Sequence, residues 1–238
     1  SVIKGIHLEG LRKVGDPNEL ALKYYNQGID EIILMDAVAA YYDRNSLSEI
    51  VKKTCCNVFV PITVGGGIRK IDDIQIALNA GADKIAINTQ AVIEPEFIKR
   101  AKKVFGSQCI VASIDAKKKT DNTWEVYIDN GREPTGKDVI EWAKELELLG
   151  AGEIMLTSID KEGTKKGFDI ELNKMVYESI TIPIISSGGA GNIKDVSELI
   201  LNTDIDAVAI ASILHYNIED IHRLKECLND YEKINVRL

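Results

Sequence analysis

The sequence is poor in the residues on which many secreted and metal-binding proteins depend. It has 4 cysteines and 3 histidines, with no Cys-x-x-Cys spacing and no histidine beside a cysteine. This pattern disfavours a disulfide framework and a Cys/His metal site, and it is typical of reduced thiols in the cytoplasm. Neither a Ser-His-Asp order nor a nucleophilic cysteine signature is present. We therefore expect no metal and no cofactor.

Long apolar runs and an excess of positive charge are also missing. No run comes near the roughly 18 apolar residues of a membrane span, and the first residues lack the apolar segment of a signal peptide. The net charge of −8 disfavours a nucleic-acid partner. We therefore expect a cytoplasmic protein that binds neither membrane nor nucleic acid. Its 238 residues predict one domain over 1–238.

What the sequence does contain is an internal repeat. The segment Val60–Gly67 (VPITVGGG) recurs 122 residues later as Ile182–Gly189 (IPIISSGG), and Glu31–Leu34 recurs at the same offset as Glu153–Leu156. Each copy of the longer segment is an apolar run that contains a proline and closes with glycines. A repeat of this length predicts a scaffold built from two similar halves.

Short apolar runs alternate with amphipathic stretches along the chain. The runs are apolar at nearly every position, which is typical of strands buried on both faces of a parallel sheet. Their alternation with helices predicts an α/β fold, a (β/α)8 TIM barrel of two similar half-barrels. The expected strands are 31–35, 58–64, 84–88, 109–114, 153–157, 182–186 and 206–211, and the expected helices lie near 17–28, 46–56, 70–80, 93–105, 137–149, 170–179, 192–201 and 217–229.

The number of expected strands is odd. Seven strands do not close a regular eight-stranded barrel. By the repeat, strand 109–114 needs a partner that would end before Ser1. We therefore expect that the first barrel strand is missing from this sequence. An open α/β sheet is the alternative, but it leaves the repeated glycine turns unexplained.

Two glycine-rich turns, Gly65–Gly67 and Ser187–Gly191, follow expected strands and precede expected helices. Glycine lets backbone N–H groups approach an anion, and the helix that follows favours negative charge. In a barrel each turn works with the turn after the next strand, here Asn88–Thr89 and Ala211–Ser212. Two such sites suit a substrate with a phosphate at each end; the alternative is that the glycines only shorten the turns.

Asp36 and Asp115 end two of the expected strands, at the face where barrel enzymes carry their catalytic residues. A carboxylate there acts as a general acid or base if burial or a neighbour shifts its pKa. The alternative is that each aspartate caps the turn that follows. At the opposite face Glu31, Lys84 and Glu153 begin three strands, either as a structural ion network or as a gate towards a partner protein.

These residues resemble the cyclase subunit of imidazole glycerol phosphate synthase, the HisF family. The likeness extends from about Lys4 to the C-terminus and is carried by both glycine turns and several further motifs. These are Phe105–Gln108, Ser113–Lys117, Gly150–Ile154, Leu156–Asp160 and Gly81–Lys84. The resemblance implies a cyclase/lyase that receives ammonia through the barrel from a HisH-type glutaminase subunit docked at the bottom. It further implies a bisphosphorylated ribulosyl aminoimidazole carboxamide as substrate and imidazole glycerol phosphate as product.

The resemblance also implies roles for single residues. Asp115 would be one of two acid/base aspartates, with Asp36 and Glu162 as further catalytic candidates. Glu31, Lys84 and Glu153 would be three of four ammonia-gate residues; the fourth, an Arg, and the second Asp belong to the first strand. The candidate phosphate- or substrate-binding residues are Gly66, Gly67, Asn88, Thr89, Thr157, Ser187, Gly188, Gly189, Ala211 and Ser212.

Some residues on the substrate face depart from the family pattern. Val38 and Ala40 replace two hydroxyl side chains, and Glu162 stands where an aspartate is usual. With Lys4–Arg12 and Tyr42–Leu47, they look like a WbuZ-like paralogue branch. That branch is thought to amidate an N-acetyl sugar to an acetamidino group for surface polysaccharide or flagellar glycan. The HisF-type cyclase is our main prediction; the sugar-amidating paralogue and a non-catalytic barrel that activates a glutaminase are the alternatives.

Overall fold

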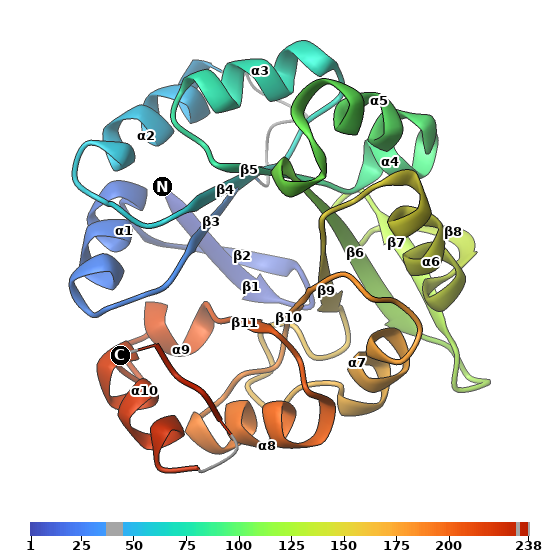
Figure 1. Ribbon diagram of the computed structural model, residues 1–238. Helices are drawn as coiled ribbons and strands as arrows, with labels where there is room; N and C mark the ends of the chain where they lie inside the picture. Colours follow the sequence, from blue (N-terminus) through green and yellow to red (C-terminus); the bar gives the residue numbers. More distant parts are fainter. Residues whose placement is uncertain (37–44, 232–233, 238) are drawn as a thin grey trace.

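A curled sheet of parallel strands forms the centre of the protein, with helices around its outside (Figure 1). The computed structural model describes residues 1–36, 45–231 and 234–237. Along the sheet the order is β11-β10-β9-β6-β5-β4-β3, and every neighbouring pair is parallel. All seven expected strands are thereby confirmed. They are β3 (Ile32–Met35), β4 (Ile62–Gly65), β5 (Lys84–Ile87), β6 (Ile110–Lys118), β9 (Glu153–Ser158), β10 (Ile184–Ser187) and β11 (Ala207–Ala209).

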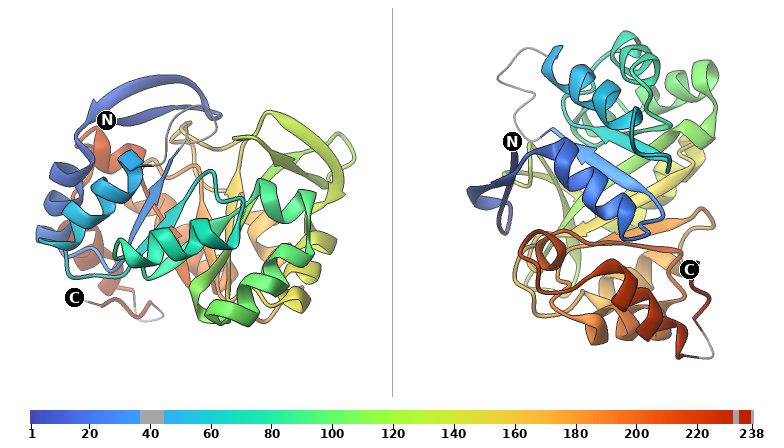
Figure 2. Two further views of the ribbon diagram at one scale, coloured as in Figure 1. Left: turned by 90° about the horizontal axis from the view of Figure 1, so that it is seen from above. Right: turned by 90° about the vertical axis from the view of Figure 1, so that its left-hand side faces the viewer.

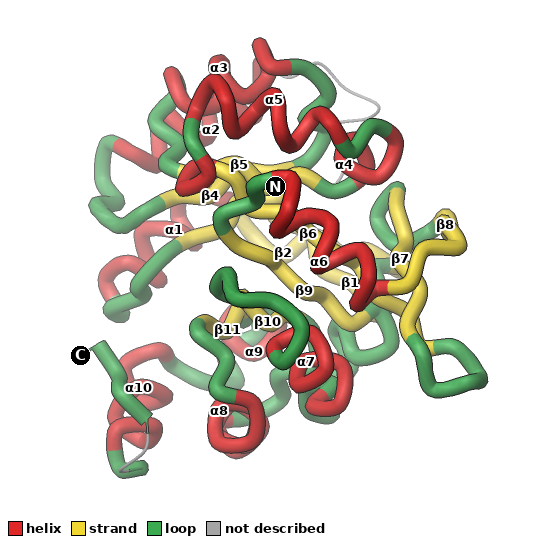
Figure 3. The backbone as a smooth tube through the Cα atoms, turned by 45° about the vertical axis from the view of Figure 1, so that its right-hand side comes forward, coloured by secondary structure: helices red, strands yellow, loops and turns green. Residues whose placement is uncertain are grey.

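The helices cover the outer face of this sheet (Figure 3). The helix expected over 93–105 is α5 (Glu96–Phe105), which begins later because Glu94 precedes Pro95 and proline disfavours the helical conformation in the residue before it. A separate short helix, α4 (Thr89–Ile93), was not expected. The helices are α1 (Pro17–Asn26), α2 (Asn45–Cys55), α3 (Ile71–Asn79), α4 (Thr89–Ile93), α5 (Glu96–Phe105), α6 (Val139–Leu149), α7 (Ile170–Tyr177), α8 (Ile193–Thr203), α9 (Ser212–His215) and α10 (Ile221–Asn229), with a 3-10 turn, η1 (Ser107–Cys109).

Two antiparallel hairpins interrupt the expected strict alternation of strands and helices. Strands β1 (Val2–Ile6) and β2 (Glu9–Gly15) form the first, and β7 (Trp124–Ile128) and β8 (Glu133–Asp138) form the second. Both lie at the same end of the molecule (Figure 2, left). Strand β7 pairs with the far end of β6, which extends beyond the expected 109–114. The hairpins therefore add structure above the carboxyl ends of the parallel strands.

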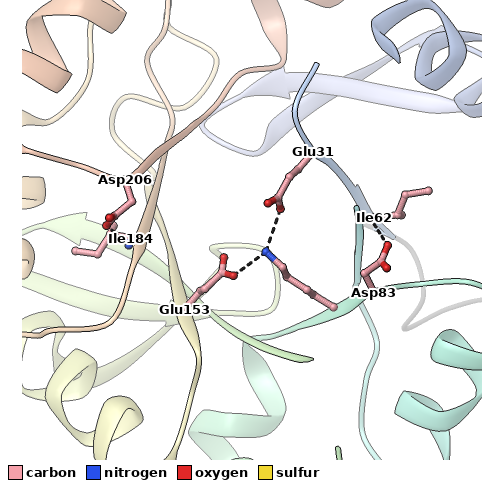
Figure 4. A network of polar contacts seen from close by, with 7 residues as sticks. Glu31, Ile62, Asp83, Glu153, Ile184 and Asp206 are labelled. Atoms are coloured by element: carbon pink, nitrogen blue, oxygen red, sulfur yellow. Dashed lines mark hydrogen bonds and ion pairs between the residues drawn. The ribbon is translucent and has the colours of Figure 1, made fainter. Parts of the chain in front are cut away.

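The two halves of the sheet repeat each other in detail. Asp83 accepts a hydrogen bond from the backbone N–H of Ile62 at 2.8 Å, and Asp206 accepts one from Ile184 at 3.1 Å (Figure 4). In both halves an aspartate just before one strand thus holds the start of the preceding strand. These matching contacts support the interpretation of two similar half-barrels.

The apolar side chains form two separate clusters. The larger joins the helices to the outside of the sheet and includes the fully buried Trp124 and Trp142. The smaller consists of Ala86, Val111, Met155 and Ile185, one from each of four parallel strands. In β5 the side chains of Lys84 and Ala86 share one face because strand side chains alternate. The smaller cluster therefore forms a layer inside the curled sheet, next to Lys84.

Strands β3 and β11 are the two ends of the sheet, and the described residues include no strand that pairs them. Helix α1 follows the first hairpin and lies beside α9 at this edge (Figure 1). The curled parallel sheet with outer helices agrees with the expected α/β barrel class. An additional first strand remains a prediction.

Candidate functional site

One large cavity, about 1620 Å³, follows the inner face of the curled sheet. Strand alternation divides its wall into layers. Glu31, Lys84 and Glu153 form the layer at the amino ends of the strands, and the small apolar cluster around Ala86 and Met155 comes next. All the candidate residues predicted at the carboxyl ends line the same cavity: Asp36, Gly66, Gly67, Asn88, Thr89, Asp115, Thr157, Glu162, Ser187, Gly188, Gly189, Ala211 and Ser212.

Asp115 lies on β6 at the carboxyl end of the cavity. Its strand neighbours Ser113, Ile114 and Ala116 are buried. Loss of contact with bulk water raises the pKa of Asp115 from 3.8 to about 7, and a hydrogen bond from Asn88 opposes this rise. The carboxyl group is therefore poised to gain and lose a proton near neutral pH, as a general acid/base requires.

Asn88 holds this carboxyl group from the end of β5. Its amide Nδ2 donates to Asp115 Oδ2 at 2.9 Å. Its amide oxygen is buried and has no hydrogen-bond partner among the described residues. A buried acceptor without a partner is costly, so this oxygen is ready for a donor from a bound molecule. The sequence had indicated Asn88 as a phosphate contact, and its hydrogen bond to Asp115 was not anticipated.

The first glycine turn follows β4. Gly66 and Gly67 have φ of 95° and 63°, which favour glycine. A Cβ atom on Gly66 would overlap the backbone of Asp36, whose N–H donates to the Gly65 carbonyl at 2.9 Å. Glycine is thus required here for close approach as well as for conformation. Thr89, at the next strand's end, accepts a hydrogen bond from the Asp129 N–H at 3.2 Å.

The second glycine turn follows β10 and has the same construction. Gly188 and Gly189 have φ of 93° and 116°, and a Cβ atom on Gly189 would overlap the carbonyl oxygen of Gly167. The turn is thereby pressed against the loop that follows β9. Ala211 and Ser212, at the end of β11, line the cavity beside it.

The helices behind the two turns are capped alike. Asp73 accepts from the backbone N–H of Arg69 and Lys70 at 2.8 and 2.7 Å. Asp195 accepts from the N–H of Gly191 and of the next residue at 2.8 and 3.2 Å. These carboxylates therefore hold the backbone between each glycine turn and the helix that follows it in the same way in both halves.

Glu162, on the loop after β9, forms an ion pair with Lys4 of the first hairpin. Glu162 is buried, and burial lowers the pKa of Lys4 to about 8. His7 secures the same contact, because its backbone N–H donates to the Glu162 carbonyl at 2.8 Å. The His7 ring nitrogen Nδ1 lies 2.8 Å from the Ile159 carbonyl oxygen. The hairpin is thus fastened over the cavity, and Lys4 is a site residue that we had not predicted.

Lys84 contacts two carboxylates at the other end of the cavity, those of Glu31 and Glu153, which are labelled in Figure 4. Its ammonium is 3.0 Å from Glu31 and 2.6 Å from Glu153. Although burial opposes the charge, the hydrogen bonds to Glu153 and Glu31 raise the pKa of Lys84 above its ordinary value. The structure therefore brings the three predicted gate residues into one ion network that lines the cavity.

The remaining site predictions fall partly outside the structure. Val38 and Ala40, the departures after β3, lie outside the described residues. Within residues 1–36, 45–231 and 234–237 there is no group of three or more His, Cys, Asp or Glu that would hold a metal ion. In the same part of the chain, no helix is both long and apolar enough to cross a membrane.

Comparison with known proteins decides the family. Residues 1–220 match the model of the family described as "Histidine biosynthesis protein". The subunit HisF of imidazole glycerol phosphate synthase from Legionella pneumophila is 59% identical over 195 residues, which are 82% of this chain and 92% of that protein. The chain belongs to the HisF family of histidine biosynthesis proteins. The resemblance inferred from the motifs is confirmed.

Proposed function

We propose that this HisF-family chain is the cyclase subunit of an imidazole glycerol phosphate synthase. It uses ammonia to cleave and cyclise a bisphosphorylated ribulosyl aminoimidazole carboxamide. The observation that carries the proposal is the position and the pKa of Asp115. Its pKa is raised to about 7, and it lies at one end, which we call the mouth, of a cavity whose other end is lined by the ion network of Glu31, Lys84 and Glu153. The 59% identity to a HisF subunit supports the same reaction.

Asp115 serves as the acid/base group. Ammonia loses protons as new carbon–nitrogen bonds form, and the nitrogen that leaves the cleaved bond gains one. A carboxyl group with a pKa near 7 both accepts and returns protons at neutral pH. Asn88 orients it by the 2.9 Å hydrogen bond and offers its free amide oxygen to the substrate. Glu162 keeps the Lys4 ammonium over the same mouth.

The two glycine turns bind the two phosphates. Gly66 and Gly67 present backbone N–H groups at one side of the mouth, and Gly188 and Gly189 do so at the other. The arrangement is symmetric because the two halves repeat, and this suits a substrate with a phosphate at each end. The alternative that the glycines serve only tight turns does not account for their position in the cavity wall.

Ammonia enters from the opposite end, where a HisH-type glutaminase subunit docks. Lys84, Glu31 and Glu153 form a charged network at that entrance. Beyond it lies the apolar layer around Ala86 and Met155, which disfavours a charged ammonium ion more than neutral ammonia. Ammonia therefore enters at the charged network, and it crosses the apolar layer as a neutral molecule on its way to Asp115.

The two alternatives gain less support. The sugar-amidating paralogue was inferred from Val38, Ala40, Glu162 and the segments Lys4–Arg12 and Tyr42–Leu47. Val38, Ala40 and residues 42–44 lie outside the described residues, and Glu162 forms an ion pair with Lys4. A barrel that only activates a glutaminase has no use for the raised pKa of Asp115. A relative that is 59% identical over 82% of the chain is a synthase subunit.

Turnover of the full chain with ammonium salt and the bisphosphate substrate tests the proposal. We expect imidazole glycerol phosphate, identified by mass spectrometry, and its loss in the Asp115→Asn variant. A parallel reaction contains a nucleotide-linked N-acetyl sugar in place of the bisphosphate. Conversion of the sugar alone would favour the paralogue, and stimulation of a glutaminase without turnover of either compound would favour the non-catalytic barrel.

A further inference from the structure

Three consecutive residues, the last residue of α9 and the two that follow it, each contact a different side chain from a distant segment. The Tyr24 hydroxyl and His215 Nδ1 are joined by a 2.6 Å hydrogen bond. The Lys165 ammonium lies 5.5 Å from the centre of the Tyr216 ring. Asn217 accepts a hydrogen bond from Lys23. We call Tyr24, Lys23 and Lys165 the α9 clasp.

The clasp comes from two segments far from α9 in the chain. Tyr24 and Lys23 belong to α1, and Lys165 belongs to the loop after β9 that also packs against Gly191. Helix α9 is a single turn, and it begins directly after Ala211 in the cavity wall. Holding its last residues therefore fixes the backbone at its start.

The corresponding helix in the other half has a different support. The residue after α4, Glu94, pairs with Arg100, only six positions further along the chain, at 2.6 Å. Ile93, the last residue of α4, is 67% exposed. The end of α4 is thus supported from nearby in the chain, although its first residue, Thr89, accepts a hydrogen bond from the distant Asp129 N–H. The end of α9 is instead held from distant segments, and α9 lies next to the edge where β11 and β3 have no described pairing. At this edge the clasp connects α1 to α9, whereas elsewhere in the sheet neighbouring units are connected by strand pairing.

Tyr24 of the clasp and His215, to which it is hydrogen-bonded, are both neutral. Tyr24 is buried, and burial raises its pKa to about 12. Burial, and then the charges of Lys4 and Lys23, lower the pKa of His215 to about 4. The hydrogen bond between them therefore persists across the working pH range, and bound phosphate meets a fixed backbone.

We propose that Tyr24, Lys23 and Lys165 are positioning residues that hold Ala211 and Ser212 in place for the phosphate bound at the second glycine turn. This inference rests on the proposed function of that turn. The clasp residues act through α9 and touch no reacting atom. A misplaced backbone weakens binding of the phosphate that it cradles, while ammonia, which arrives through the interior, is unaffected.

The Tyr24→Phe variant removes one hydroxyl and keeps the ring. Loss of a net hydrogen bond predicts a rise of about fivefold in the KM for the bisphosphate, with kcat and the KM for ammonium near their original values. Tyr25→Phe is the matched control, because Tyr25 is the neighbouring tyrosine of α1 and its ring contacts Phe59 instead. An equal KM for the bisphosphate in the two variants would overturn the inference.

Inorganic phosphate provides a test that does not need turnover. The amide signals of Ala211 and Ser212 are followed by NMR during a phosphate titration of the original chain, Tyr24→Phe and Tyr25→Phe. We expect weaker binding only in Tyr24→Phe. Equal binding by both variants would overturn the clasp. If the original chain binds phosphate but turns over no bisphosphate, the proposed reaction fails while the clasp is still tested.

Discussion

Each end of the cavity contains an ionisable side chain, and the two side chains have different surroundings. At the amino end Lys84 contacts two carboxylates, and its pKa is raised, so its charge is secured. At the carboxyl end Asp115 contacts a neutral amide, and burial raises its pKa to about 7, so its charge is easily lost. Both groups line one cavity, with an apolar layer between them.

This difference in pKa means that Lys84 stays charged at the amino end, whereas Asp115 exchanges a proton at the carboxyl end. An ionisable group remains charged when an opposite charge compensates its loss of water, and it becomes neutral when none does. Glu31 and Glu153 compensate Lys84, whereas the Asn88 amide compensates Asp115 only in part. The amino end is therefore suited to admit and orient ammonia, as the proposed function requires, and the carboxyl end is suited to acid/base chemistry.

The largest expected effect comes from removing the proton-exchanging group. Asp115→Asn should lower ammonium-driven kcat by a factor on the order of 10² to 10⁴, because the variant carries no titratable group at that position. Steady-state rates with saturating ammonium and bisphosphate measure the loss. Asp121→Asn, at an exposed carboxylate after β6, is the control and should turn over normally. A near-normal rate in Asp115→Asn would exclude Asp115 as the acid/base group.

The same substitution should reveal the cost of charging Asp115 in the folded protein. Because its folded pKa, about 7, exceeds the ordinary 3.8, the folded state binds more protons between these values and loses stability as pH rises through them. The stability of Asp115→Asn relative to the original chain should therefore increase from pH 4 to pH 7, by up to about 4 kcal/mol, and level off above. Urea unfolding at several pH values measures this difference. A difference independent of pH would contradict the raised pKa.

A smaller and more selective effect is expected at the amino end. Lys84→Met leaves Glu31 and Glu153 without their cation, so glutamine-driven turnover should change about tenfold, which corresponds to about 1.4 kcal/mol. Ammonium-driven turnover should change much less, because added ammonium does not depend on delivery by the glutaminase. Lys99→Met, which removes an exposed lysine paired with Glu96, is the control. Equal changes in both assays would indicate that Lys84 is only structural.

The sequence predicted the parallel strands well because strands covered on both faces are apolar at nearly every position. It missed the hairpins because one strand of each lacks this signal: β8 contains Pro134 and Gly136, and β2 contains Arg12 and Lys13. Their partners β1 and β7 contain several strand-favouring residues, such as Ile3 and Val126, but each of these strands is only 5 residues long.

The candidate site could be predicted only in part. The glycine turns and Asp115 follow from their places after apolar runs, which topology brings to one face. The partners of these residues could not be inferred, because Lys4 meets Glu162, and Tyr24 meets His215, only through the folded chain. Asn88 was expected at a phosphate, and only the register of β5 against β6 places its amide on Asp115.

A direct pH titration of Asp115 is the most decisive test of the contrast between the two cavity ends. Carbon-13 NMR of the side-chain carboxyl signals would identify its resonance as the one absent from Asp115→Asn. We predict an inflection near pH 7, well above the ordinary 3.8 of an aspartate. An inflection below about pH 5 would place Asp115 among ordinary carboxylates and would contradict its assignment as the acid/base group.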